Sequence, residues 1–369
     1  MAALGTPSEV RRRRFSYLRG LLAKARDPII ILPYLGYGTP QMLRLCGRVL
    51  QDEGFRPTSD AERRWRNLVA FIKRMESDEV PGAKLRASFK NVNVETISDR
   101  QGYFAVEIPG GKAGWNELTL ELVRKPEIRA TGRVLVPPPE AQFGVVSDID
   151  DTIVYSDVIR KWRMIVSLAL SNARTRKPFK GVGAFYRALH RGVNPLFYVS
   201  KSPWNLYVPL LEYLEVQGLP IGPLLLRDFG LRMNKNHKTE AIQDILRTYP
   251  DLKFILIGDS GEQDPEIYSD IVRRFPERIR AIYIRSVNPD ETRIRAVEKL
   301  IEEVAKTGCQ LVLAPDSEFA AAHAAAEGLI AAAALAEVRA DKKADVSLGS
   351  LPKLEIAGSA RSPRRRPGR

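Results

Sequence analysis

Ser-Asp-Ile-Asp-Asp-Thr at residues 147–152 is an acidic stretch that directly follows an apolar run at residues 143–147. Four more apolar runs follow it, and segments with helical spacing of apolar residues separate them. Strands that alternate with helices are typical of an α/β fold with a parallel sheet and helices on both faces. The acidic stretch then lies at the carboxyl end of the first strand, where open α/β sheets bind their ligands.

The expected strands of this sheet are residues 143–147, 195–200, 221–226, 253–258 and 280–285. The expected helices are residues 203–217, 239–249, 265–275 and 290–307. Ser202-Pro203 and Asp264-Pro265 each combine an N-cap residue with a proline that suits the first helical position.

Other polar side chains fall at the ends of these strands. Ser200 ends the second strand, Asp259 and Asp264 follow the fourth, and Lys238 begins the helix before the fourth. Because the carboxyl ends of parallel strands meet at one edge of the sheet, we expect these groups to lie close together. The acidic stretch alone also fits an exposed turn with helix caps, but the position and order of the other groups argue against that interpretation.

The spacing of Asp148 and Asp150 suits phosphoryl chemistry. Just past a strand, residues i and i+2 can project the same way, so both carboxylates can reach one phosphorus atom. One can act as the nucleophile while the other handles the proton of the leaving group. The chain has only three His and two Cys, so an oxygen-rich cluster of this kind predicts Mg²⁺ rather than Zn²⁺.

Taken together, four motifs resemble the haloacid dehalogenase superfamily of phosphotransferases: Asp-x-Asp-x-Thr at 148–152, Ser200, Lys238, and Gly-Asp-x-x-x-x-Asp at 258–264. Within it, the sequence looks like the phosphatidate phosphatases of the actin-patch-protein type, which are related to the lipin catalytic domain. The closer resemblance rests on residues 148–153, Tyr-Val-Ser-Lys-Ser-Pro-Trp-Asn-Leu-Tyr at 198–207, and Gly-Asp-Ser-Gly-Glu-Gln-Asp-Pro-Glu-Ile-Tyr at 258–268. It covers about residues 144–287 and implies a Rossmann-like catalytic domain.

The resemblance also implies a role for each acidic residue. Asp148 attacks phosphorus and forms an aspartyl-phosphate, and Asp150 protonates the leaving oxygen and then activates water. Asp148, the backbone carbonyl of Asp150, and Asp259 hold Mg²⁺, with Asp264 as a further ligand or as a support for the metal. Thr152 hydrogen-bonds within the loop and fixes Asp148.

Ser200 and Lys238 are implied to bind the non-bridging phosphate oxygens, where negative charge needs stabilisation in the transition state. Lys201 departs from the small polar residue expected beside Ser200, so we expect the phosphate side of the pocket to differ. His237, next to Lys238, is either an acid–base group or a half-exposed loop residue. A response-regulator receiver also pairs acids with a lysine, but the spacing at 148–152, the long insert after it and the second acid pair argue against that fold.

The N-terminal part has a different pattern. Residues 28–136 alternate apolar and polar residues over short runs with turns between them, which predicts a β-rich, sandwich-like accessory domain. Its expected strands are residues 28–35, 42–50, 84–94, 102–108, 117–123 and 128–136, with one helix at residues 59–76. Three prolines at 137–139 predict a stiff linker, and the catalytic domain is expected at residues 140–315. Residues 316–369 are expected to be an Ala-rich helix and a basic disordered tail outside the core.

The positive charge is concentrated in three segments. The chain of 369 residues has a formal net charge of +14. Residues 1–27, the basic arm, and residues 361–369 are rich in arginine, which is typical of solvated tails and also of segments that bind anionic membranes or nucleic acid. Residues 158–191 hold nine Lys or Arg and no Asp or Glu.

The third basic segment lies in an insert at residues 153–194. In the superfamily such inserts often cover the active site and select the substrate. Residues 160–176 have helical spacing of apolar residues, which predicts either a helix packed on the core or an amphipathic helix on an anionic membrane, with Arg160 and Arg163 contacting the substrate. Trp204, beside the phosphate-binding strand end, is either a core residue or a contact for the lipid.

The resemblance implies a Mg²⁺-dependent phosphatidate phosphatase, which makes diacylglycerol and phosphate. The alternatives are a superfamily phosphatase acting on a soluble or nucleic-acid 3′-phosphomonoester, and a non-catalytic module that binds anionic lipid. Nucleic acid is not the expected partner, although the basic tails keep it among the alternatives. No run approaches the ~18 consecutive apolar residues of a spanning helix, so we expect a cytoplasmic protein that associates with membranes peripherally.

Overall fold

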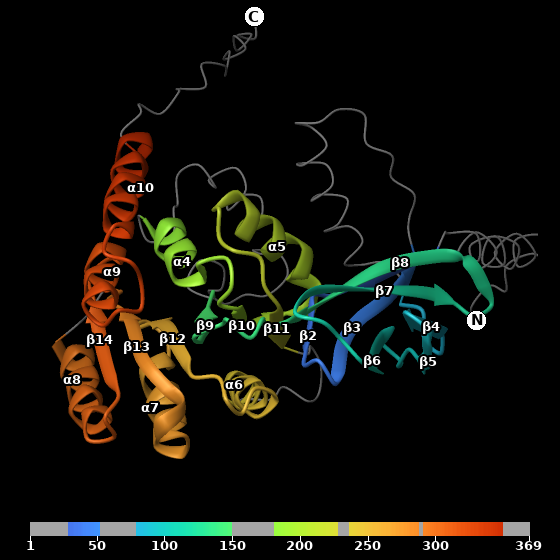
Figure 1. The fold of residues 1–369 in the computed structure, drawn as a ribbon, viewed down its shortest axis with the longest axis horizontal. Coiled ribbons are helices and arrows are strands. Elements are labelled where there is room, and N and C mark those ends of the chain that lie inside the picture. Colours follow the sequence, from blue (N-terminus) through green and yellow to red (C-terminus); the bar gives the residue numbers. More distant parts are fainter. Residues whose placement is uncertain (1–28, 52–78, 150–180, 228–235, 288–290, 350–369) are drawn as a thin grey trace, which may run out of the picture.

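The computed structural model describes residues 29–51, 79–149, 181–227, 236–287 and 291–349, which form an α/β structure with one parallel and one mixed sheet (Figure 1). The parallel sheet has six strands in the order β11-β10-β9-β12-β13-β14. They are β9 (Gly144–Asp148), β10 (Leu196–Pro203), β11 (Leu224–Arg227), β12 (Phe254–Asp259), β13 (Ile279–Arg285) and β14 (Gln310–Ala314).

Helices cover both faces of the parallel sheet, as the sequence pattern predicted. Two clusters of buried side chains, one on each face, form the core. Because β9 and β10 are covered on both sides, almost every residue in them is buried, which explains their unbroken apolar runs. One face carries α4 (Val182–His190), α5 (Tyr207–Val216), α9 (Ser317–Ala326) and α10 (Ala334–Gly349); the other carries α6 (His237–Thr248), α7 (Asp264–Arg274) and α8 (Glu291–Ala305).

The N-terminal strands form a second sheet of eight strands with its own core. Every second residue of β6 is buried, as expected for a strand with one covered face. All pairings are antiparallel except that of β2 with β8. The strands are β1 (Ile29–Pro33), β2 (Gly36–Gly38), β3 (Met42–Gln51), β4 (Lys84–Phe89), β5 (Val92–Ile97), β6 (Tyr103–Pro109), β7 (Gly114–Leu122) and β8 (Lys125–Val136).

Two expectations for this part need correction. The run at residues 84–94 is a hairpin rather than one strand, because the chain turns at Lys90, whose φ of 52° lies in the left-handed region. The predicted sandwich would have two separate sheets. Instead, β3 is long enough to pair with β1, β2 and β6, and it joins all eight strands in one sheet.

A tight joint connects the two sheets. The ring of Tyr34 stacks on Trp204 with centroids 4.4 Å apart, and the Leu35 N–H donates to the Tyr207 hydroxyl at 2.6 Å. The guanidinium of Arg48, which is 9% exposed, donates to the side chain of Asn205 at 2.9 Å. The N-terminal sheet therefore fixes the segment that directly follows the end of β10.

The C-terminal helices belong to the core, contrary to the expectation that residues after 315 lie outside it. Ala320, Ala321 and Ala324 of α9 and Val338 of α10 are buried in the cluster that also contains α4 and α5. Small side chains let α9 pack closely, so a segment that resembles low-complexity sequence is part of the half that contains the parallel sheet. The sequence also did not predict β14 or α4.

The helices expected at residues 59–76 and 160–176, and both basic tails, lie outside the described residues. Among the helices that the structure describes, none combines the length and the apolar composition that crossing a bilayer requires.

A charge placed on the buried face of α9 tests this packing. Ala324→Asp should lower the free energy of unfolding by about 3 kcal/mol or more, because the carboxylate is buried without a partner. Ala322→Asp, on the exposed face of the same helix, should change it by less than about 0.5 kcal/mol. Denaturant unfolding followed by circular dichroism measures both. Equal small effects would show that α9 is not part of the core.

Candidate active site

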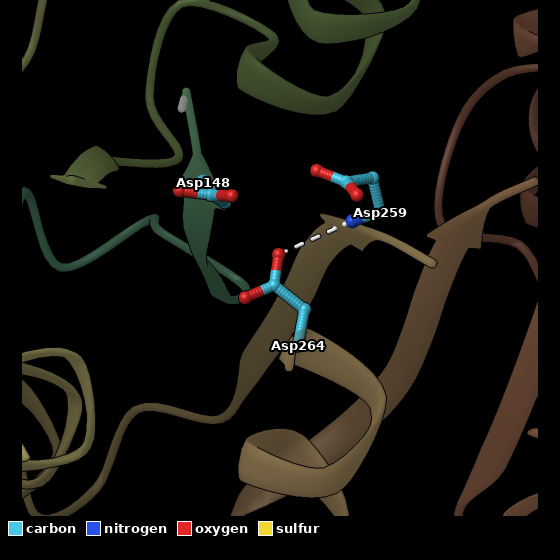
Figure 2. Close-up of side chains that lie close together, drawn as sticks. All are labelled: Asp148, Asp259 and Asp264. Atoms are coloured by element: carbon cyan, nitrogen blue, oxygen red, sulfur yellow. Dashed lines mark hydrogen bonds between the residues drawn. The ribbon is translucent and has the colours of Figure 1, made fainter. Parts of the chain in front are cut away.

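The candidate site lies at the carboxyl edge of the parallel sheet. Asp148 is the last residue of β9, Asp259 the last of the neighbouring β12, and Asp264 the first of α7. One carboxylate oxygen of each lies within 4.8 Å of the others. Figure 2 shows the three side chains converging from these elements. The sequence prediction that distant acids meet at this edge is confirmed for these three residues.

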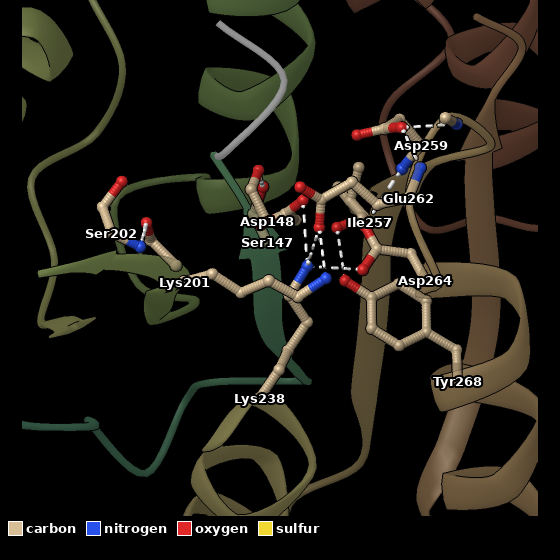
Figure 3. A network of polar contacts seen from close by, with 12 residues as sticks. Ser147, Asp148, Lys201, Ser202, Lys238, Ile257, Asp259, Glu262, Asp264 and Tyr268 are labelled. Atoms are coloured by element: carbon tan, nitrogen blue, oxygen red, sulfur yellow. Dashed lines mark hydrogen bonds and ion pairs between the residues drawn. The ribbon is translucent and has the colours of Figure 1, made fainter. Parts of the chain in front are cut away.

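Lys238 lies in the middle of this group. Its side chain is 2% exposed, and its Nζ is 3.0 Å from Asp148 Oδ2, 2.5 Å from Asp264 Oδ1 and 3.3 Å from Glu262 Oε2. An ammonium group has three donors and no acceptor, so three carboxylate oxygens match its capacity. Figure 3 shows the resulting network, which connects α6 with β9, α7 and the loop between β12 and α7.

Lys201 forms the second cationic contact of the network. Its Nζ is 2.8 Å from Glu262 Oε2, so Glu262 bridges the two lysines. Burial alone would raise the pKa of Glu262, but the hydrogen bond from Lys201 and the charge of Lys238 hold it below its ordinary value. Lys201, which departs from the family pattern, is thus paired with a carboxylate of the site.

The site brings more carboxylates than ammonium groups together. Asp148, Asp259, Glu262 and Asp264 contribute four carboxylates, and Lys201 and Lys238 contribute two ammonium groups, so these six side chains, counted alone and as ionised, sum to −2. We call these six residues the carboxylate–lysine cluster. A hard divalent cation with oxygen ligands fits this donor set and this charge.

The loop after β12 holds Asp259 and Asp264 in defined orientations. Asp259 Oδ1 accepts hydrogen bonds from the N–H groups of Gly261, at 2.7 Å, and Glu262, at 3.0 Å. Asp264 Oδ2 accepts from the N–H of Asp259 at 3.2 Å, while its other oxygen contacts Lys238. Asp264 was predicted as the cap of α7. The cap is instead Gln263, and Asp264 lies inside the first turn with its carboxylate turned toward the site.

Arg293 of α8 fixes the same loop from outside. Its guanidinium donates to the backbone carbonyls of Ser260, at 2.7 Å, and Glu262, at 2.5 Å, and it pairs with Glu266 through two nitrogens. The sequence analysis missed this residue because nothing in its neighbourhood marks a contact about 30 positions away. Glu262 was also missed, although it lies inside the motif at 258–264.

Three further residues singled out from the sequence lie in the described part of the chain. Ser200 is buried within β10, which continues to Pro203 beyond the predicted strand end, and its hydroxyl accepts from the Ser202 N–H at 2.9 Å. Trp204 is half-buried and stacks on Tyr34 between the two sheets, as the core role predicts, while its contact with lipid stays a prediction. His237 is half-buried with Nε2 3.4 Å from the Leu225 carbonyl oxygen, which agrees with the structural interpretation rather than an acid–base role.

The remaining predicted site residues are Asp150, Thr152, Arg160 and Arg163, which lie outside the described residues. Their roles stay predictions.

Gly258 provides a test of this geometry. A Cβ atom there would lie 2.7 Å from both Cβ and Cγ of Asp264, closer than real side chains approach. Gly258→Ala should therefore displace Asp264 and leave Lys238 in a changed position. A displacement of about 1 Å can lower turnover by about a hundredfold. Phosphate release measures the loss, and circular dichroism at the assay temperature shows that the protein is folded. Wild-type turnover in this variant would show that the position of Asp264 is unimportant.

Comparison with known proteins shows what the segment that carries this site resembles. Residues 143–286, which carry the whole carboxylate–lysine cluster, match the family model described as phosphatidate phosphatase APP1, catalytic domain. Phosphatidate phosphatase APP1 of Saccharomyces cerevisiae is 35% identical over 151 residues, which are 39% of this chain and 26% of that protein. An uncharacterized protein of Schizosaccharomyces pombe is 28% identical over 243 residues, 60% of this chain and 40% of that one.

The chain thus spans between about a quarter and two fifths of the length of these curated relatives. Among solved structures, a carbohydrate acetylesterase from Xanthomonas citri overlaps 73% of this chain and 72% of that one, with a TM-score of 0.25 and 12% identity. A likeness of that size supports no argument about fold or function. The segment at residues 143–286 is therefore similar to the catalytic domain of phosphatidate phosphatase APP1.

Proposed function

We propose that the chain is a Mg²⁺-dependent phosphatidate phosphatase that hydrolyses phosphatidate to diacylglycerol and phosphate. The observation that supports this most directly is the carboxylate–lysine cluster, whose six side chains sum to −2, inside the segment that matches the family. We also propose that the parallel sheet is of the haloacid dehalogenase type, that residues 28–136 act as an accessory domain, and that the enzyme is peripheral to the cytoplasmic face of a membrane.

The donor set of the cluster fits Mg²⁺, which prefers carboxylate and water oxygens. Asp148 and Asp259 would hold the ion, because each lies at a strand end and Asp259 Oδ1 is already oriented by two N–H groups. Asp264 uses both oxygens on Lys238 and the Asp259 N–H, so we assign it the supporting role rather than that of a ligand. When bound, Mg²⁺ would neutralise charge on the phosphate and on Asp148.

In the proposed reaction a carboxylate oxygen of Asp148 attacks phosphorus and forms an aspartyl-phosphate. Asp150 gives a proton to the leaving glycerol oxygen and then takes one from the water that hydrolyses the intermediate. For this role Asp150 must start protonated. Thr152 would form a hydrogen bond within the loop that follows Asp148 and so fix the position of Asp148.

The contacts of Glu262 with the two lysines indicate where the phosphate would bind. All three donors of Lys238 contact carboxylates, and the contact with Glu262 is the longest of the three, at 3.3 Å. Glu262 therefore lies where an anion bridges Lys201 and Lys238, and a phosphate oxygen would take over this contact. Ser200 of β10 would bind a second oxygen.

Phosphate release tests the proposal. The protein is stripped of metal with a chelator and assayed with phosphatidate vesicles, p-nitrophenyl phosphate and 3′-phosphorylated DNA, before and after Mg²⁺ is returned. We expect no turnover without metal, recovery with Mg²⁺, and a preference for phosphatidate. Full activity in excess chelator overturns the metal assignment. A preference for a soluble or DNA phosphate, or lipid binding without turnover, supports an alternative function instead.

Asp148→Asn removes the attacking charge and keeps the shape of the side chain. Its kcat should fall to less than about a hundredth of the wild-type value, since the loss of a nucleophile costs factors of ~10² or more. Asp251→Asn makes the same chemical change on an exposed residue and should leave kcat unchanged. If the Asp148 variant kept a larger fraction of kcat while folded, Asp148 would not be the nucleophile.

The basic insert is proposed to attach the enzyme to anionic lipid. Reversing Arg160, Arg163 and Arg174 to Glu should weaken binding to phosphatidate vesicles by well over tenfold, because each cation near an anionic surface contributes on the order of 1 kcal/mol. Vesicle sedimentation measures this. Turnover of p-nitrophenyl phosphate should change little, since the carboxylate–lysine cluster is intact.

The matched control reverses Arg273, Arg274 and Arg295, which are exposed on α7 and α8. It makes the same change in net charge on another surface and should weaken vesicle binding much less. Equal losses in both triple variants would mean that net charge, not the insert, determines attachment. Equal losses of vesicle and p-nitrophenyl phosphate turnover in the first variant would mean that the insert is structural.

A further inference from the structure

Arg293 does not belong to the carboxylate–lysine cluster, but it contacts the loop that carries three of its members. Its Nε donates to the Ser260 carbonyl oxygen at 2.7 Å, and one Nη donates to the Glu262 carbonyl oxygen at 2.5 Å. Arg293 lies on α8, beyond residues 143–286 that match the family. The family match therefore assigns it no role.

The contact with Ser260 reaches Asp259 through a single peptide group. The carbonyl of Ser260 and the N–H of Gly261 belong to the same planar trans peptide, so they point in opposite directions. The guanidinium binds the carbonyl, and the N–H on the other side donates to Asp259 Oδ1 at 2.7 Å. Arg293 therefore fixes the orientation of a group that orients the Asp259 carboxylate.

The charge of Arg293 also strengthens this hydrogen bond. A cation at the carbonyl oxygen polarises the peptide, which makes its N–H a better donor, because hydrogen bonds in a chain reinforce one another. The hydrogen bond to Glu266 raises the pKa of Arg293, and the charges of Asp259 and Asp264 raise it further. A charged group thus acts on Asp259 through the peptide.

Glu266 holds the guanidinium in place. Both Nη atoms of Arg293 pair with the Glu266 carboxylate, one of them at 3.1 Å, and the Arg293 side chain is 26% exposed. A guanidinium has five donors in one plane, so it can bind the two loop carbonyls and this carboxylate together. A lysine carries its three donors on one nitrogen and cannot span these acceptors in the same way.

The peptide after Ser260 is also held from the side of β13. The Ser260 N–H donates to the Arg285 carbonyl oxygen at 2.8 Å, and the Val287 N–H donates to Ser260 Oγ at 2.9 Å. Arg293 supplies the contact to the remaining backbone oxygen of Ser260. The loop is therefore fixed before a cation arrives, and such preorganisation lowers the cost of binding.

We propose that Arg293 is a positioning residue that sets the affinity of the site for Mg²⁺, by fixing the peptide that orients Asp259. The inference rests on the proposed function, because it assumes that Asp259 holds the ion. It makes the metal site depend on α8, a helix outside the segment that matches the family.

Calorimetry of Mg²⁺ binding in the absence of substrate tests this. Arg293→Ala should weaken Mg²⁺ binding by about 10- to 100-fold, the loss typical of groups that orient a metal ligand. The Mg²⁺ concentration for half-maximal phosphate release should rise by the same factor. Arg293→Lys keeps the charge without the planar fork, so it should recover only part of the lost affinity.

Arg278→Ala is the matched control. Arg278 is also half-buried and precedes β13, at the edge of the sheet opposite the site. One of its Nη atoms donates to the backbone carbonyls of Leu246 at 3.2 Å, Tyr249 at 2.5 Å and Leu252 at 2.8 Å. Its loss should lower the stability to denaturant much as Arg293→Ala does and leave Mg²⁺ affinity unchanged. Guanidinium ion at millimolar concentration should restore Mg²⁺ affinity in Arg293→Ala only.

If Arg293→Ala does not fold, Glu266→Gln replaces it. This variant loosens the guanidinium without emptying its place, and it should weaken Mg²⁺ binding by a smaller factor.

The outcomes separate this inference from the proposed function. Wild-type Mg²⁺ affinity in the folded test variant, or an equal loss in Arg278→Ala, overturns the role of Arg293 even when phosphatidate is hydrolysed. Full recovery in Arg293→Lys would mean that charge alone suffices, which overturns the positioning role. Weaker Mg²⁺ binding in Arg293→Ala, with no phosphate turned over by the wild type, supports the inference and overturns the proposed enzyme.

Discussion

The structure of the catalytic half depends on the burial of one ammonium group. Lys238 is 2% exposed and contacts carboxylate oxygens of Asp148, Glu262 and Asp264. Removing one partner of a buried ion pair costs about 3–5 kcal/mol, because the other charge remains buried and unpaired. These contacts connect α6 with β9, with α7 and with the loop between β12 and α7. The same contacts therefore stabilise the edge of the sheet and position the carboxylates of the site.

The same contacts bring four carboxylates and two ammonium groups together. Three of the carboxylates, those of Asp148, Asp259 and Asp264, converge at one edge of the sheet. The protein holds these like charges together by backbone means: N–H groups orient Asp259 and Asp264, Gly258 makes room for Asp264, and Arg293 binds the loop carbonyls. Carboxylates held this close repel one another, which lowers the stability of the folded protein. A bound cation would reduce the repulsion, so the arrangement suits ligand binding better than stability.

The sequence predicted the features that follow from short-range pattern. The strand ends that carry Asp148 and Asp259, and the start of α7 at Asp264, follow from apolar runs and from proline and acid positions. The helix start predicted at Ser202-Pro203 is wrong, because β10 continues to Pro203 and α5 begins at Tyr207. The sequence did not predict contacts between residues that are far apart along the chain, such as Arg293 with the loop after β12 or Trp204 with Tyr34. It also placed α9 outside the core, because an Ala-rich segment has no amphipathic stripe, and only packing shows that its small side chains fit against α4. Domain boundaries and the roles of Asp150 and Thr152 stay predictions.

The N-terminal sheet also contributes to the geometry of the phosphate side. Ser200 follows the last residue of β10 that pairs with β9, its hydroxyl accepts the Ser202 N–H, and the chain continues through Pro203, where β10 ends, into Trp204 and Asn205. Those two residues are held by Tyr34 and Arg48 of the other sheet. Arg48 is itself fixed by Glu79, at 2.7 Å, and by the Gln101 carbonyl, at 2.8 Å, so it cannot follow β10 without losing these contacts. The end of β10 is therefore bounded by the parallel sheet on one side and by the N-terminal sheet on the other, and the second sheet restrains the position of Ser200 although it supplies no residue to the carboxylate–lysine cluster among the described residues.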